Sequence, residues 1–159
     1  MGRADLSLQS CSIARAVARV GDEWTILILR EMFLGTRRFD EFLCQTGMSS
    51  HLLAGRLKKL EALGVVRREA YSEHPPRSEY RLTAMGRDFW PVIIAFKQWG
   101  DCWLGDADAP VQIVHKGCGH LTRPQMTCPD CGQAMAAHDA RTELTQAYER
   151  ERQAVRRHT

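Results

Sequence analysis

The chain has 159 residues, 44% of them apolar, which is enough for one cored domain with a small appendage and too few for two full domains. Its formal net charge of +3 does not by itself indicate a nucleic-acid partner. The first ten residues lack the apolar core of a signal peptide, and the longest apolar run, Val92 to Phe96, is too short to span a bilayer, so we expect a cytoplasmic protein with no membrane partner.

Two helices are expected at the start of the chain. Apolar residues recur at helical spacing between Cys11 and Gly21, and glycine commonly ends a helix by its backbone freedom. Asp22 is a suitable N-cap for a second helix, in which apolar residues at 24–33 cover almost every face. A helix that is apolar all round belongs in the core.

The next segment predicts two short helices joined at Gly47. The first has a single buried stripe, formed by Phe39, Phe42 and Leu43. Ser49 can cap the second helix. Its inward residues are expected to be Leu53, Leu57 and Leu60, and its outward residues Ser50, His51, Ala54, Gly55 and Lys58. Two short helices around a glycine turn are typical of a helix-turn-helix.

A β-hairpin is expected to follow, with strands at 65–70 and 78–82. The segment 72–77 between them contains two prolines, which cannot donate ladder hydrogen bonds, so we expect an exposed loop. This hairpin is typical of the wing in winged-helix proteins, and His74 and Arg77 would project from its loop.

Thr83 is expected to cap one long helix that runs to Trp103, with a kink at Pro91. The aromatic side chains on this helix offer more surface than one subunit would easily bury, so a partner subunit could cover them. The segment 105–110 has no apolar periodicity and is interpreted as a linker. A short strand at 111–114, a Cys/His segment and a charged, helical tail are expected after it.

At this point the chain resembles the HxlR-type regulators, a branch of the winged-helix proteins related to the MarR group, from about Cys11 to Trp103. The resemblance rests on the order and spacing of five motifs: Cys11 with the helix containing Ile-Ala-Arg, Gly-Asp-Glu-Trp-Thr at 21–25, Arg-Arg-Phe-Asp-Glu-Phe at 37–42, Leu-Leu-Ala-Gly-Arg-Leu-Lys-Lys-Leu-Glu at 52–61, and Pro-Pro-Arg-Ser-Glu-Tyr-Arg-Leu-Thr at 75–83. It implies a homodimer that binds a pseudo-palindromic operator in double-stranded DNA, with two recognition helices in successive major grooves. Such regulators commonly repress, sometimes activate, and are not enzymes.

The predicted fold class is therefore mainly α with a small β-hairpin wing. We divide the chain into a winged helix-turn-helix domain for DNA binding and dimerisation at 11–104, a small zinc-ribbon-like β unit at 111–140 and a charged tail at 141–159. The alternative function is a winged-helix and zinc-ribbon module that binds protein.

Residues from Ser49 to Arg87 include eight Lys/Arg against four Glu, which concentrates positive charge on the helix-turn-helix and wing. The DNA-binding residues that we predict are Ser49, Ser50, His51, Arg56, Lys58, Arg67 and Arg77. Lys58 could instead belong to a merely solvated helix face. Arg68 and Arg81 could instead pair with Glu69 or Glu79 across the hairpin and be structural.

Cys11 lies where several redox-sensing members of the resembled family carry a reactive cysteine. A helix N-terminus lowers the pKa of a thiol, which supports a response to an oxidant. Cysteine also buries well as a small apolar residue, so a packing role stays open. A response to a small-molecule effector is a further hypothesis.

The C-terminal segment contains two pairs of potential metal ligands, His115 with Cys118 and Cys128 with Cys131, separated by nine residues. Two residues stand between the members of each pair, a spacing that can place one nitrogen and three sulfurs around a zinc ion. We therefore predict one structural zinc per chain. His120 competes with His115 as the nitrogen ligand. A small β unit with reduced thiols is the alternative, whereas a redox-active Cys128–Cys131 pair would need a βαβ pattern that this segment lacks.

Overall fold

The computed structural model describes residues 6–74, 76–105 and 109–157. It is mostly helical, with a two-stranded antiparallel hairpin and a second, much smaller strand pair. The chain divides into two compact units, Met1–Ile93 and Ile94–Thr159. The division falls inside helix α6 (Trp90–Trp103), whereas the sequence predicted a first domain that ends after this helix, at residue 104.

The first unit begins with three helical elements: η1 (Leu6–Leu8), α1 (Ser12–Val20) and α2 (Glu23–Leu34). Asp22 caps α2 as predicted, and its carboxylate accepts a hydrogen bond of 3.1 Å from the backbone N–H of Thr25. Gly21 ends α1, but its φ of −83° is one that any residue adopts. A Cβ at Gly21 would lie 2.7 Å from the backbone of Val17, so glycine is required here for space rather than for backbone freedom.

The two predicted short helices are α3 (Phe39–Thr46) and α4 (Ser50–Ala62). Gly47 turns the chain between them at a φ of +67°, in the left-handed region that favours glycine. The Ser49 hydroxyl accepts a hydrogen bond from the backbone N–H of Leu52 and caps α4. Both local predictions are confirmed.

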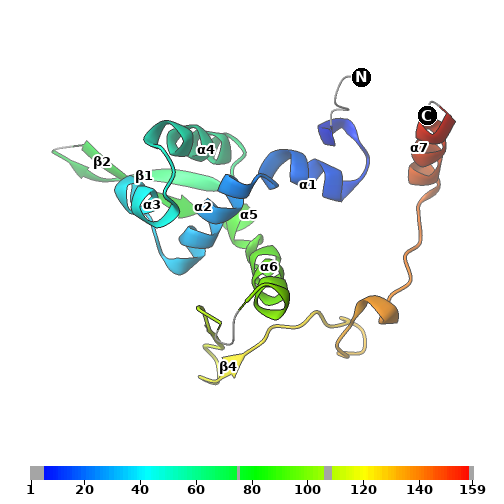
Figure 1. The fold of residues 1–159 in the computed structure, drawn as a ribbon. Helices are drawn as coiled ribbons and strands as arrows, with labels where there is room; N and C mark the ends of the chain where they lie inside the picture. Colours follow the sequence, from blue (N-terminus) through cyan, green and yellow to red (C-terminus); the bar gives the residue numbers. More distant parts are fainter. Residues whose placement is uncertain (1–5, 75, 106–108, 158–159) are drawn as a thin grey trace. The chain divides into compact units, whose positions relative to one another are not determined.

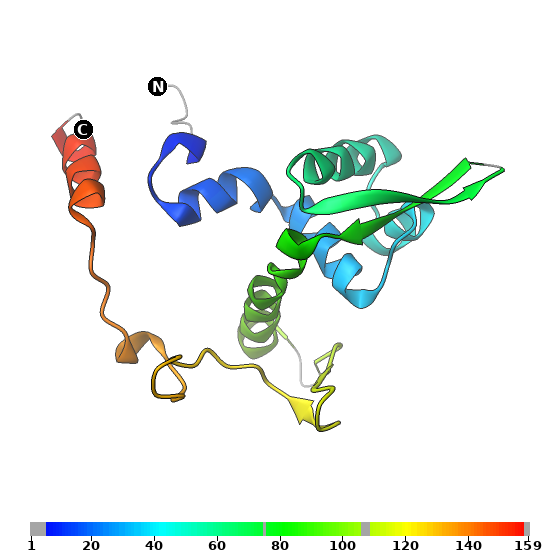
Figure 2. The ribbon, with the colours of Figure 1, turned by 180° about the vertical axis from the view of Figure 1, so that it is seen from behind.

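The hairpin consists of β1 (Val66–Glu73) and β2 (Pro76–Leu82), which pair antiparallel with an irregularity between Ala70 and Ser72. The strands extend past the helices of the first unit (Figure 2). The predicted loop at 72–77 was too long, because Glu73 pairs with Pro76 and both strands continue into it. Proline is tolerated at Pro76 because it is the first residue of its strand.

The core of the first unit lies where α2, α3 and α4 gather around the hairpin (Figure 1). Side chains from all four elements are excluded from solvent. The most deeply buried are Ile28, Leu29, Phe42, Leu53, Leu57, Leu60 and Val66. Each side chain of this size contributes about 1.5–3 kcal/mol to stability when fully buried, so this cluster holds the helix-turn-helix against the hairpin.

The long helix predicted after Thr83 is two helices, α5 (Ala84–Arg87) and α6. The Thr83 hydroxyl caps α5 by accepting from the backbone N–H of Gly86. The predicted kink at Pro91 is wrong, because the interruption precedes it and Pro91 lies in the first turn of α6, where its missing N–H has no helical partner to lose.

The second unit contains the rest of α6, β3 (Ile113–Val114), β4 (Leu121–Thr122), η2 (Ala137–Asp139) and α7 (Gln146–Arg157). The predicted linker at 105–110 lies partly outside the described residues. From 109 to 154, no side chain among those described is buried. None of the helices in the described ranges combines the length and the apolar composition that a membrane-spanning helix needs.

Candidate nucleic-acid interface

Helix α4 presents one continuous polar and small-residue face to solvent. Ser50, His51 and Lys58 are exposed on it, while Leu53 and Leu57 on the opposite face are buried. The Ser49 side chain is exposed but engaged in the cap of the helix. An exposed helix of this kind fits the major groove of B-DNA, and its first turn directs backbone amides toward phosphates.

The middle of this face consists of Ala54 and Gly55, which the predicted set of DNA-binding residues does not include. Both are exposed, and a Cβ built on Gly55 would meet nothing within 4 Å. Glycine in a helix interior lowers stability by about 0.8–1.0 kcal/mol relative to alanine. We infer that the missing side chains allow a ligand surface to approach the helix backbone between Ser50 and Lys58.

Arg56 does not lie on this exposed face. It is half-buried, and its Nε lies 3.0 Å from Oδ1 of Asp22, an ion pair without hydrogen-bond geometry. Lys59 also approaches Asp22, with Nζ at 3.8 Å from Oδ2. Burial would raise the pKa of Asp22, but the hydrogen bonds from Thr25 and the charges of Arg56 and Lys59 outweigh it and lower the pKa. Arg56 thus joins α4 to the start of α2.

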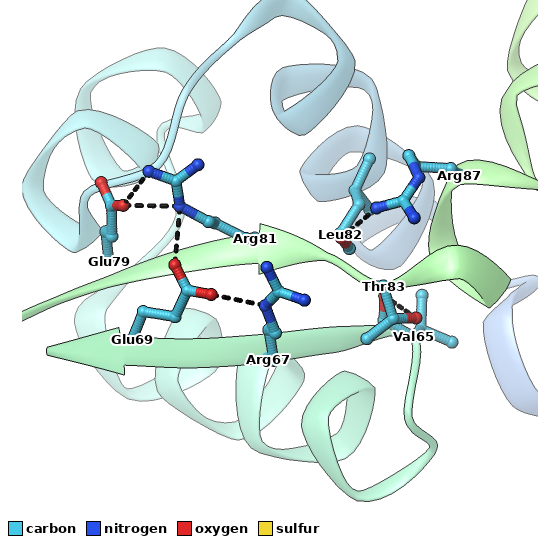
Figure 3. Close-up of polar contacts among 8 residues, drawn as sticks. All are labelled: Val65, Arg67, Glu69, Glu79, Arg81, Leu82, Thr83 and Arg87. Carbon is cyan, nitrogen blue, oxygen red and sulfur yellow. Dashed lines mark hydrogen bonds and ion pairs between the residues drawn. The ribbon is translucent and has the colours of Figure 1, made fainter.

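Charged side chains on one face of the wing form a connected network (Figure 3). Arg81 contacts Glu79 at 2.5 Å and Glu69 at 2.8 Å, and Arg67 contacts Glu69 at 2.6 Å. The structural alternative for Arg81 is therefore confirmed, and the same network includes Arg67, which the sequence had assigned to DNA. Glu69 pairs with Arg67 and offsets its positive charge, so Arg67 is a weaker candidate for phosphate contact than an arginine without an ion pair.

The end of the wing carries a different kind of arginine. Arg77 is exposed and its side chain makes no ion pair with any described residue.

Tyr71, at the irregularity of β1, stacks against the guanidinium of Arg38, whose Cζ lies 5.0 Å from the ring centroid. Tyr80 donates a backbone hydrogen bond of 2.8 Å to the carbonyl of Arg37. These two contacts join the wing to the start of α3. In the sequence, the Arg-Arg pair that opens the motif at 37–42 is the feature that could have indicated this junction.

Cys11 lies at the N-cap of α1 and is half-buried, a position compatible with both the sensor hypothesis and the packing role. Cys44 and Cys102 are exposed. In the second unit, Nδ1 of His115 lies 3.2 Å from Sγ of Cys118. Cys128 and Cys131 share a separate turn, where the backbone N–H groups of Cys131 and Asp130 lower the pKa of the Cys128 thiol.

The four predicted zinc ligands are therefore present as two pairs. Within the described part of the chain, no three His, Cys, Asp or Glu side chains are gathered closely enough to hold a metal ion. The predicted assembly of His115, Cys118, Cys128 and Cys131 stays a prediction.

A capped helix-turn-helix followed by a two-stranded wing defines the first unit as a winged helix-turn-helix. The model of the HxlR-like helix-turn-helix family matches residues 19–108. The chain belongs to this family, and it is a transcriptional regulator with a helix-turn-helix DNA-binding domain.

Two curated relatives show how far the similarity extends. An uncharacterized HTH-type transcriptional regulator of Mycobacterium tuberculosis is 39% identical over 146 residues, which cover 90% of this chain and 92% of the relative. Another, from a Synechocystis species, is 44% identical over 95 residues, covering 59% of this chain and 70% of the relative. The mycobacterial match is too long to end with the family domain, so it includes part of the C-terminal segment.

Solved structures likewise match either most of this chain or a little more than half of it. PA1607, a protein proposed to be a transcription factor, has a TM-score of 0.75 at 34% identity and covers 86% of this chain and 96% of its own. The redox regulator HypR in its oxidized form has a TM-score of 0.55 at 32% identity, over 62% of this chain and 99% of its own. The fold beyond the winged unit thus has a counterpart in PA1607.

Proposed function

We propose that this protein represses transcription in the cytoplasm by binding a pseudo-palindromic operator as a homodimer. The observation that carries the proposal is the exposed face of α4, in which polar residues flank a centre of Ala54 and Gly55. Such a face can enter the major groove closely, with Lys58 free to approach a phosphate or a base edge. Occupancy of an operator by the protein excludes other proteins from the same DNA, which makes repression the simplest outcome.

Two apolar surfaces support the homodimer. On α1, Ile13 and Val17 are 74% and 49% exposed, and they lie one helical turn apart. On α6, Phe96, Trp99 and Trp103 are 57%, 57% and 72% exposed at helical spacing. Clusters of large exposed apolar side chains mark interaction surfaces in proteins. A second copy of the chain is the occupant that a two-fold symmetric operator requires.

The proposed regulator responds to an oxidant or a small ligand. The position of Cys11 at the N-cap of α1 and the similarity to HypR, a redox regulator by name, support the oxidant. A cavity of about 680 Å³ in the second unit supports the small ligand. It is lined largely by apolar side chains, including Ile94, Val111 and Ile113, with Lys97 and Asp101 at its polar side.

The test is binding of the full-length protein to DNA from upstream of its own gene, measured by fluorescence anisotropy over a salt series. We expect two protomers per site and an affinity that falls steeply with salt. Gly55→Glu should weaken binding on the order of 100-fold, because a carboxylate at the closest approach repels phosphates. Ala62→Glu, an exposed position at the other end of α4, is the matched control and should bind within a few-fold of the wild type.

Equal binding by Gly55→Glu and the wild type would remove α4 from the interface. Binding of random duplex DNA as tightly as the upstream DNA would contradict a specific operator there. If the protein bound no duplex at all, the protein-interaction alternative would replace the proposal.

A further inference from the structure

The second unit contains two hairpins of the same design. We define the first knuckle as Ile113–Thr122 and the second knuckle as 126–135. In the first, the backbone N–H of His115 donates to the carbonyl of His120 at 2.9 Å. In the second, the N–H of Cys128 donates to the carbonyl of Gln133 at 2.8 Å. The donor in each case is the first residue of a predicted ligand pair.

The turns within the two knuckles also match. Gly119 donates its N–H to the carbonyl of His115 at 2.7 Å, and Gly132 donates to the carbonyl of Cys128 at 2.8 Å. Both glycines are left-handed, with φ of +75° and +73°, and each directly follows the second residue of a ligand pair. Outside each turn the strands pair in the same register, Val114 with Leu121 and Thr127 with Ala134.

This equivalence chooses between the two histidines. His115 corresponds to Cys128 and Cys118 to Cys131, whereas His120 corresponds to Gln133, a residue that does not ligate zinc. Nδ1 of His115 already lies 3.2 Å from Sγ of Cys118, close to the edge of about 3.6 Å that Zn–N and Zn–S bonds would span in a tetrahedron. The His115 ring also lies over Gly117, where a Cβ would come within 3.0 Å of it.

The contacts that hold the two knuckles are few: the Gln98 side chain donates a hydrogen bond of 2.8 Å to the carbonyl of Pro124 between them, and Ile113 and Leu121 line the cavity beside α6. None of their described side chains is buried, and Leu121 and Met126 are 62% and 75% exposed. Isolated two-stranded hairpins are at best marginally stable in water. A bound metal supplies the folding free energy that so small a segment cannot obtain from a core.

We propose that the two knuckles together hold one structural zinc ion per chain through His115, Cys118, Cys128 and Cys131. Three thiolates and one imidazole are ligands that zinc prefers, and four protein ligands leave no position for a substrate. Only residues 123–125 separate the knuckles, so the link from residue 122 to residue 126 spans about 14 Å at most. Zinc brings the two pairs together across this link, and His120 takes no part in the site.

The test is the zinc content of the untagged, full-length protein, purified under reducing conditions and measured by inductively coupled plasma mass spectrometry. We expect one zinc per chain in the wild type and a loss of most of it in Cys118→Ser and Cys128→Ser. Cys44→Ser and Cys102→Ser, which remove exposed thiols outside the knuckles, are matched controls and should retain one zinc. Far-UV circular dichroism of each variant should show the helices of the first unit intact.

The histidine pair gives the sharper comparison. His115→Ala should lose zinc, or bind it far more weakly in competition with a chelator, while His120→Ala should match the wild type. Cobalt(II) in place of zinc should give the intense visible absorption of a tetrahedral thiolate site, altered by His115→Ala and unchanged by His120→Ala. A wild type that takes up no zinc or cobalt would overturn the site, and zinc loss in His120→Ala rather than His115→Ala would overturn the equivalence of the knuckles.

Discussion

The hairpin of the first unit and the two knuckles of the second are all antiparallel pairs, but they are stabilised in different ways. β1 and β2 contribute Val66 and Leu82 to a core that three helices complete. The knuckles keep their backbone hydrogen bonds without burying any described side chain. In the wing, side-chain packing therefore fixes the strands, whereas in the knuckles the turn geometry is set locally by glycine and by short-range hydrogen bonds.

The difference shows where each unit is sensitive to change. A buried apolar residue of the first unit packs against several elements, so its replacement weakens the whole helix-turn-helix. No described side chain of a knuckle is buried, so we expect the replacement of a knuckle residue to change the unfolding of the first unit little. If the knuckles hold zinc, their sensitive positions are the metal ligands and the left-handed glycines rather than the apolar side chains.

The largest expected effect tests the core of the first unit. Phe42 on α3 is fully buried, so Phe42→Ala should lower the free energy of unfolding by about 3–5 kcal/mol, because burial is reduced and a cavity is left behind. Leu121→Ala, on the exposed β4, should change the unfolding of the helices by less than about 0.5 kcal/mol. Urea unfolding followed by far-UV circular dichroism measures both. Equal destabilisation by the two variants would contradict the contrast drawn between the units.

Much of the first unit could be predicted from the sequence because local chemistry determines it. Asp22 and Ser49 cap their helices as predicted, and Gly47 takes a left-handed conformation at the predicted turn. The length of the wing was predicted less well, because the strand pairing of Glu73 with Pro76 depends on register and not on the composition of the loop. The break before α6 follows from a local conformation at residues 88–89 that apolar periodicity does not report.

The candidate site was predictable only in outline. The exposed face of α4 followed from helical periodicity, but the orientation of Arg56 did not, since it depends on Asp22 in another helix. The ion pair of Arg67 was missed because its partner Glu69 lies on the same strand face, a pairing that alternation along a strand permits but does not require. For the zinc site, which stays a prediction, spacing alone proposed the four ligands, while the preference for His115 over His120 rests on the hydrogen-bond pattern of both knuckles.

A smaller effect is expected at Asp22, where a cap and an ion pair coincide. Asp22→Ala should destabilise the protein by about 1 kcal/mol at pH 7 through loss of the cap. Asp22→Asn keeps a capping oxygen and removes the charge facing Arg56 and Lys59, so it should destabilise less. The pKa of Asp22 is lowered in the folded state, so its charge stabilises the fold above its ordinary pKa of 3.8, and that contribution is lost as the pH falls through the folded value.

Urea unfolding from pH 7 down to about pH 3 separates these contributions. The difference between the wild type and Asp22→Asn should narrow as the pH falls below the ordinary carboxyl range, whereas Asp22→Ala should stay less stable than Asp22→Asn. A constant difference between the wild type and Asp22→Asn over this range would mean that the charge does not contribute. In that case Arg56 would be held by packing alone.

The smallest expected effect lies at the end of the wing, where binding and stability should separate. Arg77→Ala should leave the unfolding free energy within about 0.5 kcal/mol of the wild type, because this exposed side chain has no ion-pair partner among the described residues. It should reduce the slope of log K against log salt by up to about 0.9 for each phosphate that Arg77 neutralises in the wild type, and weaken binding to all sequences alike. Arg67→Ala is the matched comparison: it breaks the ion pair with Glu69, so it should cost up to about 1 kcal/mol of stability and change the salt slope less. A salt slope unchanged in Arg77→Ala but reduced in Arg67→Ala would reverse the assignment, and the charge network of the wing would then face the DNA.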